Sequence, residues 1–534
     1  MTGKVSRALV PVMALGTFVV VLDNTIMNVS ISALVEDLGT TVSGVQAAIS
    51  LNALMMAAFV LMGGKLADII GVKKAFLGGA VLYVTGSLLA SLSNNLAVFI
   101  LGWCAIQGLG AALMLPNITT IIRGNITGKA RAQAYGTMAG INALAMAVGP
   151  LIGGFLTTYF SWRWAFRLEV FVLVFVLLMR NVIPRDVLAA HRPKLDRVGV
   201  AWQALAMVCI VVAMLAISNY GLLIAKQPLM IGDYAFAPFG LAITPFLFGL
   251  GLLCLIQFVR HEKKVDQSGK DTLVDLKLFR IADYVRGLNI RFVHTALVAG
   301  TTFAVPLFLQ VTFNLSAFQT GLVLLSLTAG LMLTALLGSR KGLQFLPRLK
   351  IRLGFLVAIL GLFVMALFVY NGDNALGMLP GLFIYGLGLG LIASQIVNLI
   401  MSAVNPRQTA EAAGATSTLE TLGSSVGTAI VGTVLVVSLT GGIGRLVDNS
   451  SVFTPEHKTQ ISNELSGSAQ VVSSQVLSET ITEDGAYEQE AIKIYDKARQ
   501  NAFIITLLFM AFAAFMAFVL AKKLPATKLS SSTA

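Results

Sequence analysis

Three carboxylic acids stand within long runs of apolar residues. Asp23 lies in VLDNTIMNVSI, Glu169 follows SWRWAF, and Glu420 lies in GATSTLETLGSSVG. A carboxylate without a partner in hydrocarbon is costly, so it either takes up a proton or finds a partner. These three acids are therefore candidates for binding and releasing protons.

The surroundings of two of these acids leave their roles open. Asp23, together with Thr25 and Asn28, also fits a static hydrogen-bonded cluster that holds helices together. Glu169 is either a second site for a proton or a cation, or a side chain that extends to the membrane interface. Arg167 stands two residues before Glu169, and positions two apart face different sides of a helix. We therefore do not expect these two to be simply each other's partners.

Other polar residues give fewer indications of chemistry. Arg291 and His294 are three residues apart, hence on one face of a helix, and His294 either relays protons or packs as a satisfied histidine. Cys104, Cys209 and Cys254 lie inside apolar runs without metal-ligand spacing. No catalytic nucleophile or phosphate-binding glycine loop stands out. We expect a protein that is not an enzyme, and that uses no metal or cofactor besides a proton gradient.

The elements that position these residues are membrane helices, as the composition indicates. The 534 residues are 56% hydrophobic and only 12% charged, with a mean hydropathy of +0.83, which is far from the balance of soluble domains. The net charge of +13 does not indicate nucleic acid, because Lys and Arg gather at the borders of apolar runs. The expected partners are the lipid bilayer and a small-molecule substrate.

The number of membrane spans follows from the length of the apolar runs. A helix needs about 20 apolar residues to cross a hydrocarbon core of about 30 Å. On this basis we predict fourteen spans, at residues 8–36, 43–64, 75–94, 96–121, 133–159, 164–181, 199–220, 239–259, 284–312, 317–338, 352–370, 375–402, 409–440 and 500–521.

The charges between the spans predict the orientation. Basic clusters, for example Lys65 with Lys73 and Lys74, follow every second span, whereas the short loops on the other side carry few basic residues. The positive-inside rule then places both termini in the cytoplasm and the protein in the cell membrane.

A faint internal repeat predicts the domain organisation. The loop GGKLADIIGVKK after the second span has a degraded counterpart, GSRKGLQFLPRLKIR, after the tenth. We predict two six-helix halves, residues 1–197 and 263–534, with an inserted helix pair at 198–262. Repeated halves place a transported substrate near the bilayer midplane where they meet. We expect a monomer.

Residues 441–498 form the only long polar insertion, within the second half. They are either a small external cap or a solvated loop, because Ser and Gly interrupt their first part. The run from Glu488 to Ala502 favours a helix that continues into the last span.

Two motifs combine glycine with residues that bend or cap helices. In GGKLADIIGVKK at 63–74, glycine permits tight turns and close helix approach, and Asp68 is suited to cap a helix N-terminus or to pair with Arg131. In AVGPLIGG at 147–154, proline breaks the helix ladder and glycine lets another helix pack closely. The motif residues are Gly64, Asp68, Gly71, Lys73 and Arg131, then Gly149, Pro150, Gly153 and Gly154.

Together these motifs resemble those of the major facilitator superfamily, specifically its fourteen-helix drug:proton antiporter branch, over nearly the whole chain. SWRWAF at 161–166 is similar to the entry of the sixth helix in this branch, and its Trp162 and Trp164 are typical of a membrane interface. The resemblance implies a major facilitator fold that works by alternating access. It also implies that the 63–74 motif latches one conformational state and that the 147–154 motif belongs to an exporter.

The fourth span departs from the family pattern. LGWCAIQGLGAALMLP at 101–116 matches R-x-x-Q-G-x-G-A-A at Gln107, but Cys104 occupies the place of the Arg. The resemblance implies that this Arg tunes nearby carboxylates during proton exchange. Either another cation such as Arg167 substitutes for it, or the coupling differs from that of the standard antiporter.

These inferences predict a proton-coupled antiporter that exports small hydrophobic or cationic compounds, in which protonation of Asp23 and Glu420, with Glu169 as a third candidate, selects the open side. One alternative keeps the fold but exports or flips a lipid or an endogenous metabolite with altered coupling. A facilitator or importer is a second alternative, which the 147–154 motif disfavours. A third, a membrane enzyme or receptor that uses 441–498, lacks any catalytic constellation.

Overall fold

The computed structural model describes residues 8–126, 128–184, 196–225, 228–231, 234–269, 272–338, 347–372, 374–405, 409–453, 458 and 485–525. Within these residues, thirteen helices are long and apolar enough to cross a membrane. The predicted span that is absent from these thirteen is the sixth, 164–181. It corresponds to α8, Arg163–Leu178, which has 16 residues and continues as a 3₁₀ turn at Met179–Val182. At about 1.5 Å per residue, α8 alone is shorter than a hydrocarbon core of about 30 Å.

The first bundle contains the helices up to α8. Its elements are α1 (Leu9–Val29), α2 (Ile31–Asp37), α3 (Val42–Ile70), α4 (Val72–Ser91), α5 (Leu96–Phe99), the π-helical η1 (Ile100–Gln107), α6 (Gly108–Asn125), α7 (Gly128–Tyr159) and α8. The first predicted span, 8–36, is not continuous. It breaks at Ser30, whose hydroxyl lies 3.2 Å from the carbonyl of Ile26 and 2.7 Å from the hydroxyl of Thr157.

The second bundle follows a peripheral pair of helices. The pair is α9 (Arg197–Tyr220) and α10 (Ile243–Gln267), joined through strands β1 (Leu229–Ile231) and β2 (Tyr234–Phe236) and a 3₁₀ turn at Pro238–Gly240. The bundle itself contains α11 (Ala282–Phe313), α12 (Ala317–Gly338), α13 (Pro347–Tyr370), α14 (Met378–Ser402), α15 (Thr409–Asn449) and α18 (Gly485–Leu520). Short 3₁₀ turns occur at Leu276–Arg280, Ala375–Gly377 and Ala521–Lys523.

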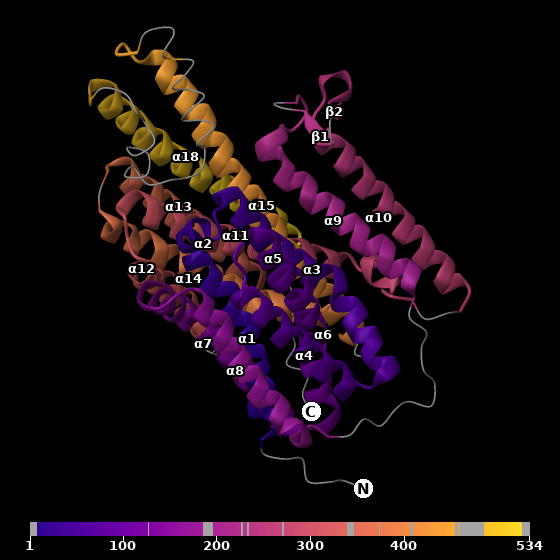
Figure 1. Cartoon of the computed structure of the whole chain (residues 1–534). Coiled ribbons are helices and arrows are strands. Elements are labelled where there is room, and N and C mark those ends of the chain that lie inside the picture. Colours follow the sequence, from indigo (N-terminus) through magenta and orange to yellow (C-terminus); the bar gives the residue numbers. More distant parts are fainter. Residues whose placement is uncertain are drawn as a thin grey trace.

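The two strands are a small addition to the predicted all-α fold. They pair antiparallel, with Leu229 opposite Phe236 and Ile231 opposite Tyr234. Figure 1 shows this hairpin at the tip of the α9–α10 pair, away from the two bundles. The helix pair itself lies beside them, since α9 packs on both α3 and α15 while α10 packs on α9.

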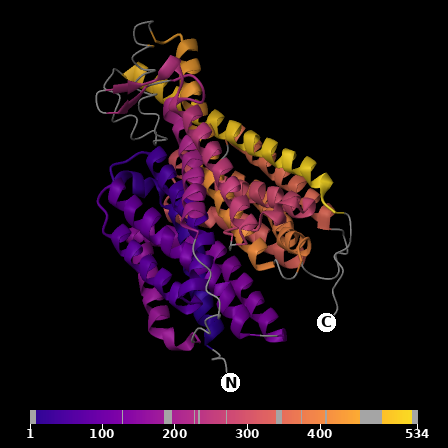
Figure 2. The same ribbon diagram turned by 90° about the vertical axis from the view of Figure 1, so that its right-hand side faces the viewer.

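The two bundles meet at one end and diverge toward the other, where α1 begins and α18 ends (Figure 2). The main contacts between them join α3 with α15 and α7 with α12. The hydrogen bonds between described residues across this boundary lie toward the end where the bundles meet. Gln310 Nε2 donates to the carbonyl of Val29 at 2.7 Å, and Ser425 Oγ donates to the carbonyl of Ser50 at 2.7 Å.

Two helices extend well beyond the others at that end (Figure 1). The 41 residues of α15 and the 36 residues of α18 exceed the length of about 20 that spans a bilayer. Ser450 Oγ contacts Glu490 Oε1 at 3.3 Å between them. The predicted helix from Glu488 to Ala502 is confirmed as part of α18, whereas 454–457 and 459–484 of the predicted cap lie outside the described residues.

Candidate functional site

Asp23 and Glu169 meet inside the first bundle. Asp23 on α1 is 3% exposed and Glu169 on α8 is 0% exposed, and the two carboxyl groups lie within hydrogen-bonding reach of each other. Trp103 on η1 donates its Nε1–H toward both Asp23 oxygens, at 3.1 and 3.0 Å. The fold therefore brings together two acids that are 146 positions apart in the sequence.

Glu169 is held by two further polar side chains. Its Oε2 accepts from Ser87 Oγ at 3.0 Å and from Gln107 Nε2 at 3.4 Å. Ser87 Oγ also lies 3.0 Å from Gln107 Oε1. The other oxygen, Glu169 Oε1, is buried with no hydrogen-bond partner among the described residues. Because Glu169 is buried, it does not fit the predicted alternative of a side chain that extends to the membrane interface.

No cation accompanies this acid pair in the described part of the chain. The described side chains that act on the two carboxyl groups are Trp103, Gln107, Ser87 and the carboxyl groups themselves. Arg167, the predicted substitute cation, is exposed and its guanidinium lies 4.9 Å above the ring of Trp164. Arg167 therefore faces away from the acids.

Cys104 occupies the place of the family Arg without taking its electrostatic role. Its Sγ donates to the carbonyl of Ala48 at 3.1 Å, so it joins η1 to α3. A π-helical segment such as η1 is rare and is often found at functional sites. Here η1 carries Trp103, Cys104 and Gln107, and close packing on α4 requires Gly86, where an added Cβ would lie 2.4 Å from the Gln107 nitrogen.

Aromatic rings cover the acid pair. Trp103 lies 5.1 Å from Phe99 and 6.3 Å from Phe166, and Phe99 lies 5.4 Å from Trp162, measured between ring centroids. Trp162 is buried and donates to Asp37 at 2.8 Å, so it does not belong to the interfacial belt that the sequence suggested. Arg163 contacts the same carboxylate and the carbonyl of Ser93.

The second bundle holds its acid differently. Arg291 on α11 donates through Nη2 to Glu420 Oε1 on α15, and their side chains are 13% and 40% exposed. His294 Nε2 lies 3.1 Å from the carbonyl of Leu389, and its Nδ1 lies 3.5 Å from Arg291 Nη1. Since the carbonyl accepts and the guanidinium donates, these contacts fit a neutral imidazole with its proton on Nε2.

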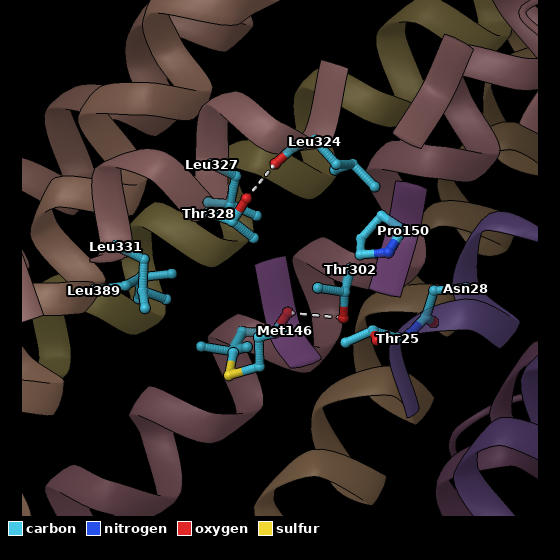
Figure 3. Close-up of a pocket in the computed structure, with 11 residues that line it drawn as sticks. Thr25, Asn28, Met146, Pro150, Thr302, Leu324, Leu327, Thr328, Leu331 and Leu389 are labelled. Carbon is cyan, nitrogen blue, oxygen red and sulfur yellow. Dashed lines mark hydrogen bonds between the residues drawn. The ribbon is translucent and has the colours of Figure 1, made fainter. Parts of the chain in front are cut away.

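A cavity lies between the two bundles (Figure 3). The first bundle supplies side chains from α1 and α7, and the second supplies side chains from α11, α12 and α14. The lining residues are Thr25, Asn28, Met146, Pro150, Val298, Thr302, Leu324, Leu327, Thr328, Leu331 and Leu389. Of the predicted site residues, Asn28 and Pro150 therefore line this cavity. Asp23 and Glu169 are not among its lining residues.

The 147–154 motif holds α7 against two helices. A Cβ added to Gly149 would lie 1.8 Å from Thr25 Oγ1, and one added to Gly153 would lie 2.9 Å from Ile26 Cα, both on α1. A Cβ added to Gly154 would lie 2.3 Å from the carbonyl oxygen of Ala317 on α12. The motif therefore makes a close contact with α1 inside the first bundle and another with α12 of the second bundle.

The 63–74 motif forms the turn between α3 and α4. Gly71 has φ +103°, a conformation that only glycine adopts without strain. Lys73 donates to the carbonyl of Ile183. Gly64 would meet no atom within 4 Å if it carried a Cβ, and the close approach is made instead by Gly63 against Ala112. The side chain of Arg131, the predicted partner of Asp68, lies outside the described residues.

Among the described residues, no group of three or more His, Cys, Asp or Glu side chains is arranged to hold a metal ion. The sequence profile of one family, described as the Major Facilitator Superfamily, matches residues 13–428. The chain belongs to the Major Facilitator Superfamily. It is accordingly a multi-pass membrane transporter and not an enzyme.

Curated relatives of this chain are named as transporters or as an efflux pump. The chain is 30% identical to the "Probable actinorhodin transporter" of Streptomyces coelicolor, over 77% of this chain and 69% of that protein. It is 28% identical to "Drug efflux pump JefA" of Mycobacterium tuberculosis, over 80% and 79%. It is 24% identical to "Multidrug transporter protein MdtP" of Bacillus subtilis, over 81% and 76%.

Solved structures show the same superfamily fold at low sequence identity. An auto-inhibited POT family peptide transporter superposes with a TM-score of 0.59 at 12% identity and covers 99% of both chains. A D-xylose-proton symporter superposes with a TM-score of 0.56 at 12% identity, covering 87% of this chain and 95% of its own. At this identity the likeness concerns the fold alone.

Proposed function

We propose that the protein is a proton-coupled antiporter that exports small hydrophobic or cationic compounds from the cytoplasm. The observation that carries the proposal is the buried pair of Asp23 and Glu169 without a cation among its described neighbours. Two adjacent carboxylates in a buried site repel each other, so such a pair holds a proton between them. The names of two relatives, one a drug efflux pump and the other a multidrug transporter, support export.

The proton acts on the helices that carry the pair. Loss of the shared proton leaves two negative charges between α1 and α8, and the repulsion favours any arrangement that separates or hydrates them. Gain of the proton restores the compact arrangement seen here. Because α1 also lines the cavity between the bundles through Thr25 and Asn28, a movement of α1 changes the substrate site.

Glu420 is proposed as a second proton site with a different partner. Its half-exposed carboxylate accepts a proton at the expense of its ion pair with the less exposed Arg291. The released guanidinium then requires another acceptor, because a buried unpaired charge is costly. His294, adjacent to Arg291, is placed to respond to that change.

Alternating access follows from the arrangement of the two bundles. We propose fourteen transmembrane helices, with α8 as the sixth, and two halves at 1–197 and 263–534 that rock against each other as a monomer. The hydrogen bonds between the bundles lie at the end away from the start of α1, including Phe318 N–H to Thr158 Oγ1 at 3.1 Å. With both termini in the cytoplasm of a cell-membrane protein, this structure represents the state closed to the outside.

The test is transport into proteoliposomes with and without an imposed pH gradient. The probes are ethidium, which is a cation, and anthracenylmethanol, which is uncharged. The gradient should accelerate wild-type transport of at least one probe by about tenfold or more, and Asp23→Asn and Glu169→Gln should remove that acceleration. Asp266→Asn, which changes an exposed acid paired with Lys277 at 3.2 Å, is the matched control. Wild-type transport that ignores the gradient would falsify the proposal.

A further inference from the structure

Among the described residues, no side chain that lines the cavity between the bundles is ionisable. Its lining consists of aliphatic residues, one proline, one methionine, three threonines and Asn28. Figure 3 shows Thr25 and Asn28 from α1 on the same side as Pro150, with Thr302 between them and Met146. A carboxylate-free lining gives no electrostatic preference for a cation, so recognition depends on shape and hydrogen bonds.

Asn28 presents an unused acceptor in this cavity. The residue is 6% exposed, and its Nδ2 donates to the carbonyl of Asn24 at 2.6 Å. Because a carbonyl only accepts, this contact fixes which end of the amide carries the hydrogens. The other end, Oδ1, is buried and has no partner among the described residues. An unpaired buried oxygen destabilises the protein, and a hydrogen-bond donor on a ligand removes that cost.

The threonine hydroxyls that line the cavity also offer acceptors and no free hydrogen. Thr25 Oγ1 donates to the carbonyl of Leu22 at 2.8 Å. Thr302 and Thr328 donate within their own helices, Thr302 to the carbonyl of Val298 and Thr328 to that of Leu325, each at 3.1 Å. Each hydroxyl has one hydrogen, so only its lone pairs remain for a ligand.

Two prolines release backbone acceptors at the same place. Pro150 in α7 has no N–H to give to the carbonyl of Met146, four residues earlier, and Met146 lines the cavity. Pro306 in α11 likewise gives no N–H to the carbonyl of Thr302. A proline inside a helix removes one backbone hydrogen bond in this way. The polar groups at the cavity thus consist mainly of acceptors.

We propose that this cavity binds uncharged, largely apolar molecules that carry a hydroxyl or N–H donor, which Asn28 Oδ1 accepts. The proposal rests on the proposed transport function and names the substrate class that this function exports. It also places the substrate site and the proton site on different faces of α1. Five residues along α1 turn the helix by about 140°, so Asn28 faces the cavity while Asp23 faces Trp103. Substrate and proton therefore act on opposite faces of one helix.

The experiment compares two matched ligands on the full chain in lipid nanodiscs at equal pH on both sides. The ligands are anthracenylmethanol and its methyl ether, which differ in one donor hydrogen, and binding is followed by fluorescence polarisation. The wild type should bind the alcohol about tenfold more tightly than the ether, the ratio that one hydrogen bond of about 1.4 kcal/mol gives.

Two variants test whether Asn28 Oδ1 causes the preference for the alcohol over the ether. Asn28→Leu keeps the size of the side chain but removes the acceptor, so the alcohol should lose its advantage while the ether binds as before. Asn24→Leu is the matched control, since Asn24 is exposed on the same helix and donates to its own helix at Val20. The control should keep the wild-type ratio.

Two results would overturn the proposal. One is equal or unmeasurable binding of the alcohol and the ether to the wild type, a comparison that needs no variant to fold. The other is a preference that survives in Asn28→Leu. Neither depends on the pH gradient, so wild-type transport that ignores the gradient, together with an intact binding preference, would refute proton coupling alone.

Discussion

The acids of the two bundles are stabilised in opposite ways. Asp23 and Glu169 in the first bundle are fully enclosed, with Trp103 donating to Asp23 and Gln107 donating to Glu169, and they have no cation among their described neighbours. Glu420 in the second bundle is half exposed and paired with Arg291. We propose that the first region balances its charge with a shared proton, whereas the acid of the second region is paired with a cation. The comparison teaches that a carboxylate in a membrane helix has two distinct solutions, and that under the proposed function the second acid takes up a proton only by giving up its ion pair.

The largest effect on transport is expected when both acids of the first bundle are replaced. The double variant Asp23→Asn with Glu169→Gln should lose gradient-driven transport, at least tenfold, to the same extent as either single variant. Two groups that share one proton act as a unit, so their effects do not add. Initial rates in proteoliposomes give the comparison. A double variant that is much worse than each single variant would mean that the two acids bind protons independently.

The ion pair of the second region should give an intermediate effect on stability. Glu420→Gln leaves the less exposed guanidinium of Arg291 without its counter-charge, and we expect a loss of about 1–3 kcal/mol, less than for a fully buried pair. Replacing both residues, Arg291→Leu with Glu420→Leu, should restore most of the melting temperature. If the double variant melts no higher than Glu420→Gln, the pair is not the source of the stability.

A smaller effect is expected where the bundles touch. Gly154→Ala places a Cβ 2.3 Å from the carbonyl oxygen of Ala317, so α7 and α12 must separate, at a cost of about 1–3 kcal/mol typical of overpacking. Gly64→Ala meets no atom within 4 Å and should leave the melting temperature and transport unchanged. Equal tolerance of both variants would show that the bundles separate there without cost.

The acids could be predicted from the sequence because charge in an apolar run is itself a signal. Asp23, Glu169 and Glu420 were all found in this way, and the neighbouring Arg291 was found as a helical-spaced pair with His294. Their partnerships could not be predicted, because the contacts of Asp23 with Glu169, and of Arg291 with Glu420, depend on how distant helices pack. The sequence order of Arg167 and Glu169 indicates only different faces, and the fold decides which face is buried.

Some site residues carried no signal in the sequence. Trp103 and Ser87 hold the two acids, yet a tryptophan or serine in an apolar run is ordinary in a membrane helix. The prediction from glycine spacing was wrong at one position of the 63–74 motif, because Gly63 and not Gly64 makes the close contact. Both residues fit the motif, and only the direction in which α3 faces α6 distinguishes them.

The π-helical turn at Ile100–Gln107 forms part of the wall of the acid site, and it contains more residues per turn than an α-helix does. Tightening that turn to ordinary α-helical winding rotates the side chains on one side of it by about 100° relative to those on the other. Trp103 and Gln107 stand within the turn, so such a rewinding would turn their side chains relative to the two carboxyl groups. The contacts that hold the acid pair therefore depend on the winding of this one segment.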